Sequence, residues 1–538
     1  MEIRKLLVAN RGEIAVRIFR TCRELGIGTV AVTAPDDRGA LHARGADEEV
    51  EITGYLHSEE HIRAAKQTGA DAIHPGYGFL AESPEFADAV EAAGLAWIGP
   101  PGDALRAGGD KLAAKRIAGE ADVPVVEEGD PAELGFPLVV KAAAGGGGRG
   151  MRVVRSAGEL DEALAAARRE AAAAFGDDRV FCERYVERPR HVEIQVLADA
   201  HGNVVALGER ECSIQRRHQK VLEEAPSPAL DPELRARMSD AAVAFAGAVG
   251  YRSAGTVEFM LDGRDFFLLE LNGRIQVEHP VTELVTGVDL VHEQLRVAAG
   301  ERLDASNRVL RGHAVEVRLY AEDPVTFLPQ AGRIERLRLP SGIRVDPGVE
   351  EGDEVGLAYD PMIAKLIAHG PTRAEALGRL RAALGETEVE GVVTNLPFLR
   401  WLVAHPALRE GETTTAFLVE HPPLSAPPPM LPPHPWRRSW RLNLPPPPPA
   451  SPPDVDAASH DHGAVAGQSA LKAPMPGTVI KVLVAAGDRV EARQTLCVLE
   501  AMKMETPVPS PYDAVVRAVH VQEGDRVAGG ALLVELEE

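Results

Sequence analysis

The chain has 538 residues, enough for several domains, and 45% of them are apolar, as in globular proteins. A net charge of −23 and an aromatic content of 4% argue against nucleic acid as a partner. No signal segment and no apolar run of about eighteen residues occurs, so we expect no membrane contact. The four cysteines lack metal-site spacing, which favours a reducing compartment, and we expect a cytoplasmic protein.

The N-terminal pattern is that of a parallel α/β sheet. Residues 6–9 form an apolar run, residues 14–25 have helical periodicity, and residues 29–32 form the next apolar run. The intervening turn does not match GxGxxG, so NAD binding is not predicted. Another strand pattern, residues 70–74, leads into a Gly-rich loop that ends at Gly78. Such loops lie where α/β sheets bind ligands.

A glycine run follows the next strand pattern. Residues 136–141 form an apolar strand that ends in Lys141, and Gly145 to Gly148 follow closely. Backbone amides in such a run can close over phosphate oxygens. A flexible linker is the alternative, but residues 151–154 again have a strand pattern, and linkers seldom separate two strands. Walker A spacing is absent, so we predict a flap over ATP.

Polar residues alternate along residues 267–280. Glu270, Asn272, Arg274, Gln276 and Glu278 are separated by apolar or small residues, and early in this run the alternation puts polar groups on one face of a strand. Carboxylate and amide oxygens are ligands that Mg²⁺ prefers. The alternative is a strand with one solvated face. The density of acidic and basic groups, close to the glycine run, favours a binding site.

Residues 1 to about 420 contain a series of specific motifs: ANRGEIA, HPGYGFL, GDK at residues 109–111, the glycine run, RHVEIQ, QRRHQK, RIQVEHPVTE and YDPMIAKL. Through these motifs this part of the chain resembles biotin carboxylase, an ATP-grasp enzyme. The chain departs from the family pattern in three respects: Ala144 replaces a glycine, Gly273 stands where Thr or Pro is usual, and the segment from Lys111 to Lys141 is short.

Proline-rich sequence follows. Pro427–Pro429 and Pro445–Pro449 bracket a short basic island with two tryptophans. Proline runs favour an extended polyproline conformation of roughly 3 Å per residue, so this linker could span on the order of 100 Å. That is the scale on which a carrier domain visits two active sites.

The C-terminal residues form an internal repeat. Gly487-Asp488-Arg489-Val490 recurs 37 residues later, at Gly524 to Val527. The repeat predicts two similar halves of short strands, with Lys503 on a hairpin tip between them. An ordinary solvated lysine is the alternative. However, Ala-Met-Lys-Met around Lys503 resembles the biotinyl carrier domain of biotin-dependent carboxylases, apart from Arg493 and Ala514 at two positions where glycine is usual.

These resemblances imply an α/β fold followed by an all-β barrel. The implied division is a Rossmann-like pre-ATP-grasp domain at 1–108, an ATP-grasp domain at 109–310 with its lid at about 122–185, a biotin carboxylase C-terminal domain at 311–421, a Pro-rich linker at 422–468 and a biotinyl/lipoyl barrel at 469–538.

The resemblance also implies roles for individual residues. The residues implied to bind ATP are Lys111, Lys141, Gly147, Gly148, Glu183, Val186, His191, Gln215 and His218. The implied ligands of Mg²⁺ or Mn²⁺ are Glu258, Glu270 and Asn272. Lys220, Arg274 and the Val277 backbone would bind bicarbonate, Glu278 would be its base, Arg344 would stabilise the biotin enolate, and Lys503 would carry the biotin.

The implied activity is ATP-dependent carboxylation of this biotin by bicarbonate, through carboxyphosphate. No carboxyltransferase domain fits in the chain, so the resemblance implies a carboxyltransferase β-subunit that binds an acyl-CoA, a biotin protein ligase as a second partner, and a homodimer of the carboxylase part. Acetyl-CoA and propionyl-CoA are the implied acceptors, with methylcrotonyl-CoA as an alternative.

Two competing functions are compatible with parts of the sequence. The first is that of an ATP-grasp ligase that joins a carboxylate to an amine, which the biotinyl tail disfavours. The second is that of a biotin carrier whose ATP-grasp domain is inactive. Bicarbonate-dependent ATP hydrolysis distinguishes an active carboxylase from such a carrier.

Overall fold

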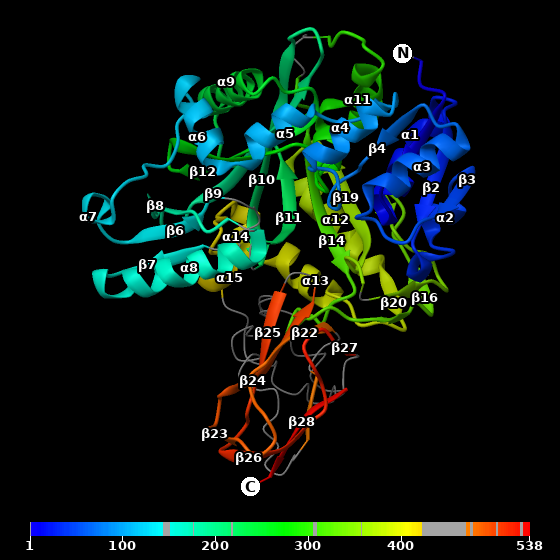
Figure 1. Ribbon diagram of the computed structural model, residues 1–538. Coiled ribbons are helices and arrows are strands. Elements are labelled where there is room, and N and C mark those ends of the chain that lie inside the picture. Colours follow the sequence, from blue (N-terminus) through cyan, green and yellow to red (C-terminus); the bar gives the residue numbers. More distant parts are fainter. Residues whose placement is uncertain are drawn as a thin grey trace, which may run out of the picture.

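The computed structural model describes residues 2–143, 151–175, 177–216, 219–304, 309–356, 358–421, 470–473, 477–501, 504–527 and 531–537 (Figure 1). Gly147, Gly148, His218, Lys503 and the predicted linker lie outside these residues. In the described part, no helix combines the length and the hydropathy that crossing a membrane requires.

The N-terminal part is a five-stranded parallel sheet with helices against it, as the sequence predicts. The strand order is β3-β2-β1-β4-β5. The strands are β1 (Lys5–Val8), β2 (Gly28–Thr33), β3 (Glu48–Glu51), β4 (Ala72–His74) and β5 (Ala96–Trp97), and the helices are α1 (Gly12–Glu24), α2 (Leu41–Arg44), α3 (Ser58–Thr68), α4 (Pro84–Ala92) and α5 (Gly102–Gly109).

A small three-stranded sheet with one long helix follows, in cyan at the edge of the molecule in Figure 1. Its strand order is β7-β6-β8. The elements of this region are α6 (Lys111–Glu120), α7 (Pro131–Leu134), β6 (Leu138–Ala142), β7 (Arg152–Val154), α8 (Leu160–Phe175) and β8 (Val180–Arg184). Strands β6 and β7 are adjacent and antiparallel, so the glycine run connects two paired strands.

The largest sheet has eight strands in the order β13-β12-β9-β10-β11-β14-β19-β17. These strands are β9 (Arg190–Ala198), β10 (Val204–Arg216), β11 (Gln219–Ala225), β12 (Ser253–Asp262), β13 (Asp265–Asn272), β14 (His313–Tyr320), β17 (Arg344–Pro347) and β19 (Met362–Gly370). The sheet therefore joins residues from 190 to 370 into one surface.

Helices and short strands complete this part of the chain. They are α9 (Pro232–Ala248), α10 (His279–Thr286), α11 (Leu290–Ala298), α12 (Arg373–Glu386), α13 (Leu396–Ala404), α14 (Pro406–Glu410), α15 (Phe417–Glu420), β15 (Gly332–Arg333), β16 (Arg336–Arg338), β18 (Glu354–Val355) and β20 (Glu388–Glu390). One apolar cluster packs α12 and α13 against β14 and β19.

The C-terminal part contains two four-stranded sheets, with strand orders β21-β28-β26-β23 and β25-β24-β22-β27. The strands are β21 (Ala470–Lys472), β22 (Gly477–Val482), β23 (Arg489–Val490), β24 (Thr495–Ala501), β25 (Met504–Pro509), β26 (Ala514–Val519), β27 (Arg526–Val527) and β28 (Leu532–Glu537). Their apolar side chains form one core. The expected all-β barrel is confirmed.

The internal repeat is also a structural repeat. Gly487 and Gly524 have nearly equal positive φ angles, 97° and 95°, which glycine adopts without steric cost. Asp488 accepts a hydrogen bond from the Ala485 amide, and Asp525 accepts one from the Gln522 amide, each at 2.8 Å. The two Gly-Asp turns therefore have the same construction, 37 residues apart.

Candidate functional site

The candidate site is centred on the amine of Lys220, in β11. Its Nζ donates hydrogen bonds to Glu193 Oε2 at 2.5 Å, Glu258 Oε1 at 2.8 Å and Glu278 Oε1 at 2.7 Å. These acids come from β9, β12 and the N-cap position of α10. The three carboxylates are almost fully buried, so the arrangement fixes three acids around one cation out of bulk water.

The charges in this cluster control its protonation. Burial acts to lower the pKa of Lys220, but Glu193, Glu258 and Glu278 outweigh it and raise that pKa well above its ordinary value. Burial acts to raise the pKa of Glu278, but Lys220, Arg318 and Arg210 hold it below its usual range. Lys220 is therefore a cation and Glu278 an anion near neutral pH.

Arg210, fully buried in β10, forms hydrogen bonds with Glu193 of the cluster and with two neighbouring glutamines. Its guanidinium donates to Glu193 Oε1 at 2.5 Å, and to Gln195 Oε1 and Gln276 Oε1 at 2.6 and 2.9 Å. A fully hydrogen-bonded, buried guanidinium orients the groups around it. The sequence patterns did not single out Arg210. Its signal was the run Glu209-Arg210-Glu211, which closely follows the apolar residues 204–207 of the same strand.

Arg318, in β14, is a second cation that the sequence patterns did not single out. Its Nη2 donates to Glu278 Oε2 at 3.1 Å, and the same nitrogen is ion-paired with Glu223. Lys220 and Arg318 therefore contact different oxygens of one carboxylate. An anion bound beside Glu278 would meet two fixed positive charges.

Glu258 and Glu270 are opposite each other on the paired strands β12 and β13, and Asn272 lies two residues further along β13. Cross-strand partners and residues two apart share a face of a sheet, so the three predicted metal ligands lie on one face. Burial and the charges of Glu258 and Glu82 raise the pKa of Glu270. A buried carboxylate, Glu258, that disfavours the charge of a partly buried one, Glu270, fits a site for a divalent cation.

His191, on β9, extends this surface. Its Nε2 lies 2.8 Å from Glu258 Oε2, and its Nδ1 lies 2.7 Å from the amide nitrogen of Gln215. His191, Glu193 and Glu258 also present ligand atoms within 4.8 Å of one another. The structure thus brings His191 and Gln215, both predicted to bind nucleotide, next to a predicted metal ligand.

The remaining predicted nucleotide-binding residues border the small sheet. Lys141 and Lys115 are both ion-paired with the buried carboxylate of Glu183. Burial lowers the pKa of Lys111, whose nearest charges are Glu270, Lys141 and Glu183. Val186 is buried just beyond β8. Lys111 therefore lies near Lys141, Glu183 and the predicted metal ligand Glu270, where phosphate groups of a nucleotide would balance the charge of the two lysines.

Arg274 connects the site to the N-terminal part. Its Nη2 donates to Asn272 Oδ1 at 3.0 Å, and its Nε lies 3.1 Å from Glu82 Oε2. A Cβ atom on the preceding residue, Gly273, would lie 2.5 Å from Leu105 Cδ2. Leu105 thus occupies the space that a side chain at position 273 would need, which accounts for glycine at this position. The carbonyl of Val277 accepts a 2.9 Å hydrogen bond from Lys365.

Arg344 forms no hydrogen bond or ion pair with the Lys220 cluster among the described residues. In the described part of the chain its guanidinium donates only to Glu283, at 2.7 Å, and to Asp346, at 2.8 Å. Arg17 and Arg20 of α1 contact the same two acids. The structure therefore does not bring Arg344 into contact with Glu278, and Arg318 has that contact instead.

The predicted hairpin falls between β24 and β25. These strands pair, with Ala501 opposite Met504. Met502 and Lys503 lie between these two partners in the sequence and outside the described residues, so the position of Lys503 stays a prediction.

Comparisons with known proteins identify the family. Models of the biotin carboxylase N-terminal domain match residues 2–105, of the carbamoyl-phosphate synthase L chain ATP-binding domain residues 110–306, of the biotin carboxylase C-terminal domain residues 316–420, and of a biotin-requiring enzyme domain residues 469–536. The matched domains define an ATP-grasp ligase joined to a biotinyl domain.

Individual relatives agree with this class. The propionyl-CoA carboxylase alpha chain of Ruegeria pomeroyi is 50% identical over 463 residues, which cover 78% of this chain and 68% of the relative. The biotin carboxylase of Halalkalibacterium halodurans is 48% identical over 441 residues, 78% of this chain and 98% of the relative.

A solved structure has the same fold. The biotin carboxylase domain of Hydrogenobacter thermophilus 2-oxoglutarate carboxylase, in complex with MgADP, ADP and bicarbonate, is 44% identical. It superposes with a TM-score of 0.76 and covers 78% of this chain and 98% of that one. The chain belongs to the biotin carboxylase family. It is an ATP-dependent ligase whose own C-terminal barrel is a biotinyl domain, and the resemblance stated from the sequence is confirmed.

Proposed function

We propose that this chain is the biotin-containing α-subunit of an acyl-CoA carboxylase that acts on acetyl-CoA or propionyl-CoA. The observation that supports this most is the presence, in one chain, of the Lys220 carboxylate cluster and of the sequence Met-Lys-Met at the junction of the paired strands β24 and β25. The similarity to a propionyl-CoA carboxylase alpha chain supports the choice of acceptor. Cytoplasmic location fits the four buried, unpaired cysteines.

Glu258, Glu270 and Asn272 would hold the divalent cation, which supplies charge neutralisation for phosphoryl transfer. Lys111, Lys141, His191 and Gln215 then position the nucleotide, together with Gly147, Gly148, Glu183, Val186 and His218. For the lysines the support is their position between Glu183 and Glu270. This division leaves Lys220 and its neighbours free for the second substrate.

Lys220, Arg274 and the Val277 backbone bind bicarbonate in this proposal, and Glu278 accepts its proton. The support is that Glu278 is ionised and fixed by two cations. The same cations lower the cost of removing a proton from an anion bound between them.

Arg318, rather than Arg344, stabilises negative charge next to Glu278. A guanidinium already directed at the reacting region needs no reorganisation when charge develops. Arg344 instead fastens α1 to β17 through Glu283 and Asp346. This assignment replaces the role that the sequence resemblance implied for Arg344.

Lys503 carries the biotin, attached by a biotin protein ligase, and the linker lets the barrel move between sites. The partner is a carboxyltransferase β-subunit that binds the acyl-CoA, and the carboxylase parts form a homodimer. Tethering keeps the local biotin concentration high.

The experiment that tests this function is transfer of labelled bicarbonate to the purified, biotinylated chain in the presence of MgATP. Label on the wild type and none on Lys503→Arg is the expected result. A fully biotinylated wild-type chain that gains no label would contradict the carboxylase assignment. Adding the carboxyltransferase partner with acetyl-CoA, propionyl-CoA or methylcrotonyl-CoA then identifies the acceptor by which one releases the label.

A further inference from the structure

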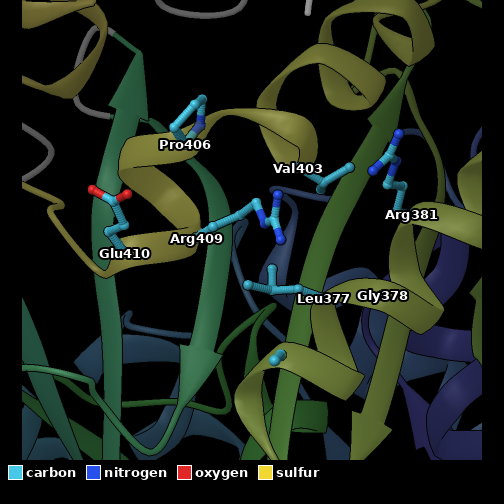
Figure 2. Close-up of a pocket in the computed structure, with 8 residues that line it drawn as sticks. Leu377, Gly378, Arg381, Val403, Pro406, Arg409 and Glu410 are labelled. Carbon is cyan, nitrogen blue, oxygen red and sulfur yellow. The ribbon is translucent and has the colours of Figure 1, made fainter. Parts of the chain in front are cut away.

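The C-terminal helices enclose a hollow that the proposed reaction does not use. It has a volume of about 410 Å³ and lies between α12, α13 and α14 (Figure 2). Its lining residues are Ala374, Leu377, Gly378, Arg381, Val403, Pro406, Arg409 and Glu410. None of them belongs to the Lys220 cluster or to the predicted nucleotide-binding residues.

Two arginines at this hollow have unpaired side chains. Among the described residues, the guanidinium groups of Arg381 and Arg409 form neither a hydrogen bond nor an ion pair. The chain as a whole has 81 acidic residues against 58 Lys and Arg, so acidic residues outnumber the cations with which they can pair. In the part of the chain that the structure describes, Arg381 and Arg409 lack an acidic partner in spite of this excess. Two free cations beside one hollow favour an anionic occupant.

Glu410 also lines the hollow, but it does not neutralise Arg409. Figure 2 shows its carboxylate and the Arg409 guanidinium directed to opposite sides of α14. The Arg409 guanidinium extends toward Leu377 and Val403, and Arg381 approaches from the other side of Val403. The cationic groups therefore border the space itself, and the acid lies at its edge.

The floor of the hollow is apolar. Leu377 and Val403 are both largely buried, and Ala374 and Pro406 add further carbon surface. A planar guanidinium packs well on such a surface while it binds a carboxylate or a phosphate in two-point contact. The hollow thus combines an apolar floor with two anion-binding groups.

Gly378 leaves free space at the apolar side of the hollow. It lies in the middle of α12, where glycine weakens a helix. A Cβ atom at Gly378 would meet nothing within 4 Å, so close packing does not require glycine there. The missing side chain leaves the space between Leu377 and Arg381 free.

We propose that this hollow binds a small organic anion in which a carboxylate or phosphate group is joined to a compact apolar body. Arg381 and Arg409 bind the anionic group, and the apolar body rests on Leu377, Val403 and the exposed backbone at Gly378. The volume of about 410 Å³ lies within the range of small-molecule binding sites.

The hollow has a direct structural connection to the Lys220 cluster. Arg373, at the start of α12, donates to the carbonyl oxygens of Leu408 and Arg409 at 2.6 and 2.9 Å. The same guanidinium donates to Glu224 of β11 at 2.6 Å. The neighbouring residue, Glu223, is the ion-pair partner of Arg318. One wall of the hollow is therefore fixed to the strand that carries the cluster.

Calorimetric titration of the full-length chain tests the proposal. The probes are phenyl phosphate and benzoate, which combine both features, inorganic phosphate, which has only the charge, and benzyl alcohol, which has only the apolar body. We expect phenyl phosphate or benzoate to bind at least ten times more tightly than the last two. The tighter of the two aromatic anions identifies the anionic group.

Matched variants assign the binding to this hollow. Arg381→Gln with Arg409→Gln, and separately Gly378→Leu, should each weaken binding at least tenfold. Arg379→Gln and Gly385→Leu make the same changes on α12 outside the hollow and should leave binding unchanged. Leucine is a strong helix former, so Gly378→Leu should not lower the melting temperature, and lost binding would not reflect unfolding.

Three results would overturn the proposal. The first is the absence of binding by both aromatic anions. The second is binding that Gly378→Leu and the double arginine variant leave unchanged, since the anion would then bind elsewhere, for example with the nucleotide-binding lysines. The third is equally tight binding of inorganic phosphate or benzyl alcohol, since one of the two features would then contribute nothing.

Discussion

The Nη2 atom of Arg318 lies 3.1 Å from Oε2 of Glu278, although 40 residues separate them in the sequence. Lys220 holds the other oxygen of the same carboxylate at 2.7 Å. A carboxylate fixed in this way has one orientation and one charge state near neutral pH. The proposed base is therefore positioned before any substrate binds.

Replacing Glu278 by Gln should abolish biotin carboxylation, because the amide cannot accept the proton. ATP should still bind, because the predicted nucleotide-binding residues lie on β9 and β10 and around the small sheet, and Glu278 is not one of them. Labelled bicarbonate transfer and nucleotide titration measure the two properties separately. Turnover within a few fold of the wild type would exclude Glu278 as the base.

The two arginines can be compared directly. Arg318→Gln should lower the carboxylation rate about 10²-fold or more, the typical effect of removing a fixed donor from developing negative charge. Arg344→Gln should have a much smaller effect on the chemical step and should mainly destabilise the contact of α1 with β17. Single-turnover rates measure the first effect and thermal unfolding the second. A larger rate loss in Arg344→Gln would restore the role implied by the resemblance.

Stability should depend on pH through Glu223. Burial, only partly offset by Arg318, raises the pKa of this carboxyl group to about 7. An acid with a raised pKa in the folded state contributes full stability below its unfolded value of about 4.5, and that contribution is lost as the pH rises through about 7. The expected loss is on the order of 1–3 kcal/mol.

Denaturant unfolding of the wild type and of Glu223→Gln, at several pH values between 4.5 and 7.5, checks this dependence. The difference in unfolding free energy between the two chains should change with pH in this window, with the wild type losing stability relative to the variant as the pH rises. A difference that stays constant would show that Glu223 titrates normally.

The barrel offers a stability test of its own. Arg493 has a positive φ of 70°, a conformation that costs a side-chain-bearing residue about 1 kcal/mol or more. Arg493→Gly should therefore stabilise the barrel by roughly 0.5–1 kcal/mol. Hydrogen exchange of barrel amides in the full chain measures the change. Arg489→Gly, in strand β23 where Arg489 pairs with Val515, should act in the opposite direction, because glycine weakens a strand.

The sequence predicted the domains' fold types well, because local patterns carry that information. The alternation that begins at Glu270 indicated a strand, which ends at Asn272, while Arg274 to Glu278 lie in the connection to α10; the repeat around Gly487 and Gly524 identified the barrel. Arg318 was missed although its strand alternates in the same way, with Glu316 and Arg318 between apolar residues. A single strand with one polar face does not reveal whether that face meets water or other charges.

The role that the resemblance implied for Arg344 stays a prediction, and local patterns could not show which arginine contacts Glu278. Which arginine reaches Glu278 depends on the order of strands in the sheet, where β11 and β14 are neighbours and β17 lies at the edge. That order results from long-range pairing, which no local motif encodes. The hollow beside Gly378 could not be predicted from the sequence either, because residues of three separate helices line it.

The repeat in the barrel has a mechanical consequence. The pairs Val498 with Pro507 in β24–β25 and Glu535 with Ala470 in β28–β21 are equivalent under the 37-residue offset. The counterpart of the Lys503 hairpin is thus the pair of strands at the barrel's two chain ends, and Figure 1 shows the C end on the opposite side of the barrel from the start of β25. In the proposed function, the biotin would therefore lie at the end of the barrel opposite its two chain ends. The length of the barrel would then add to the distance that the biotin can reach.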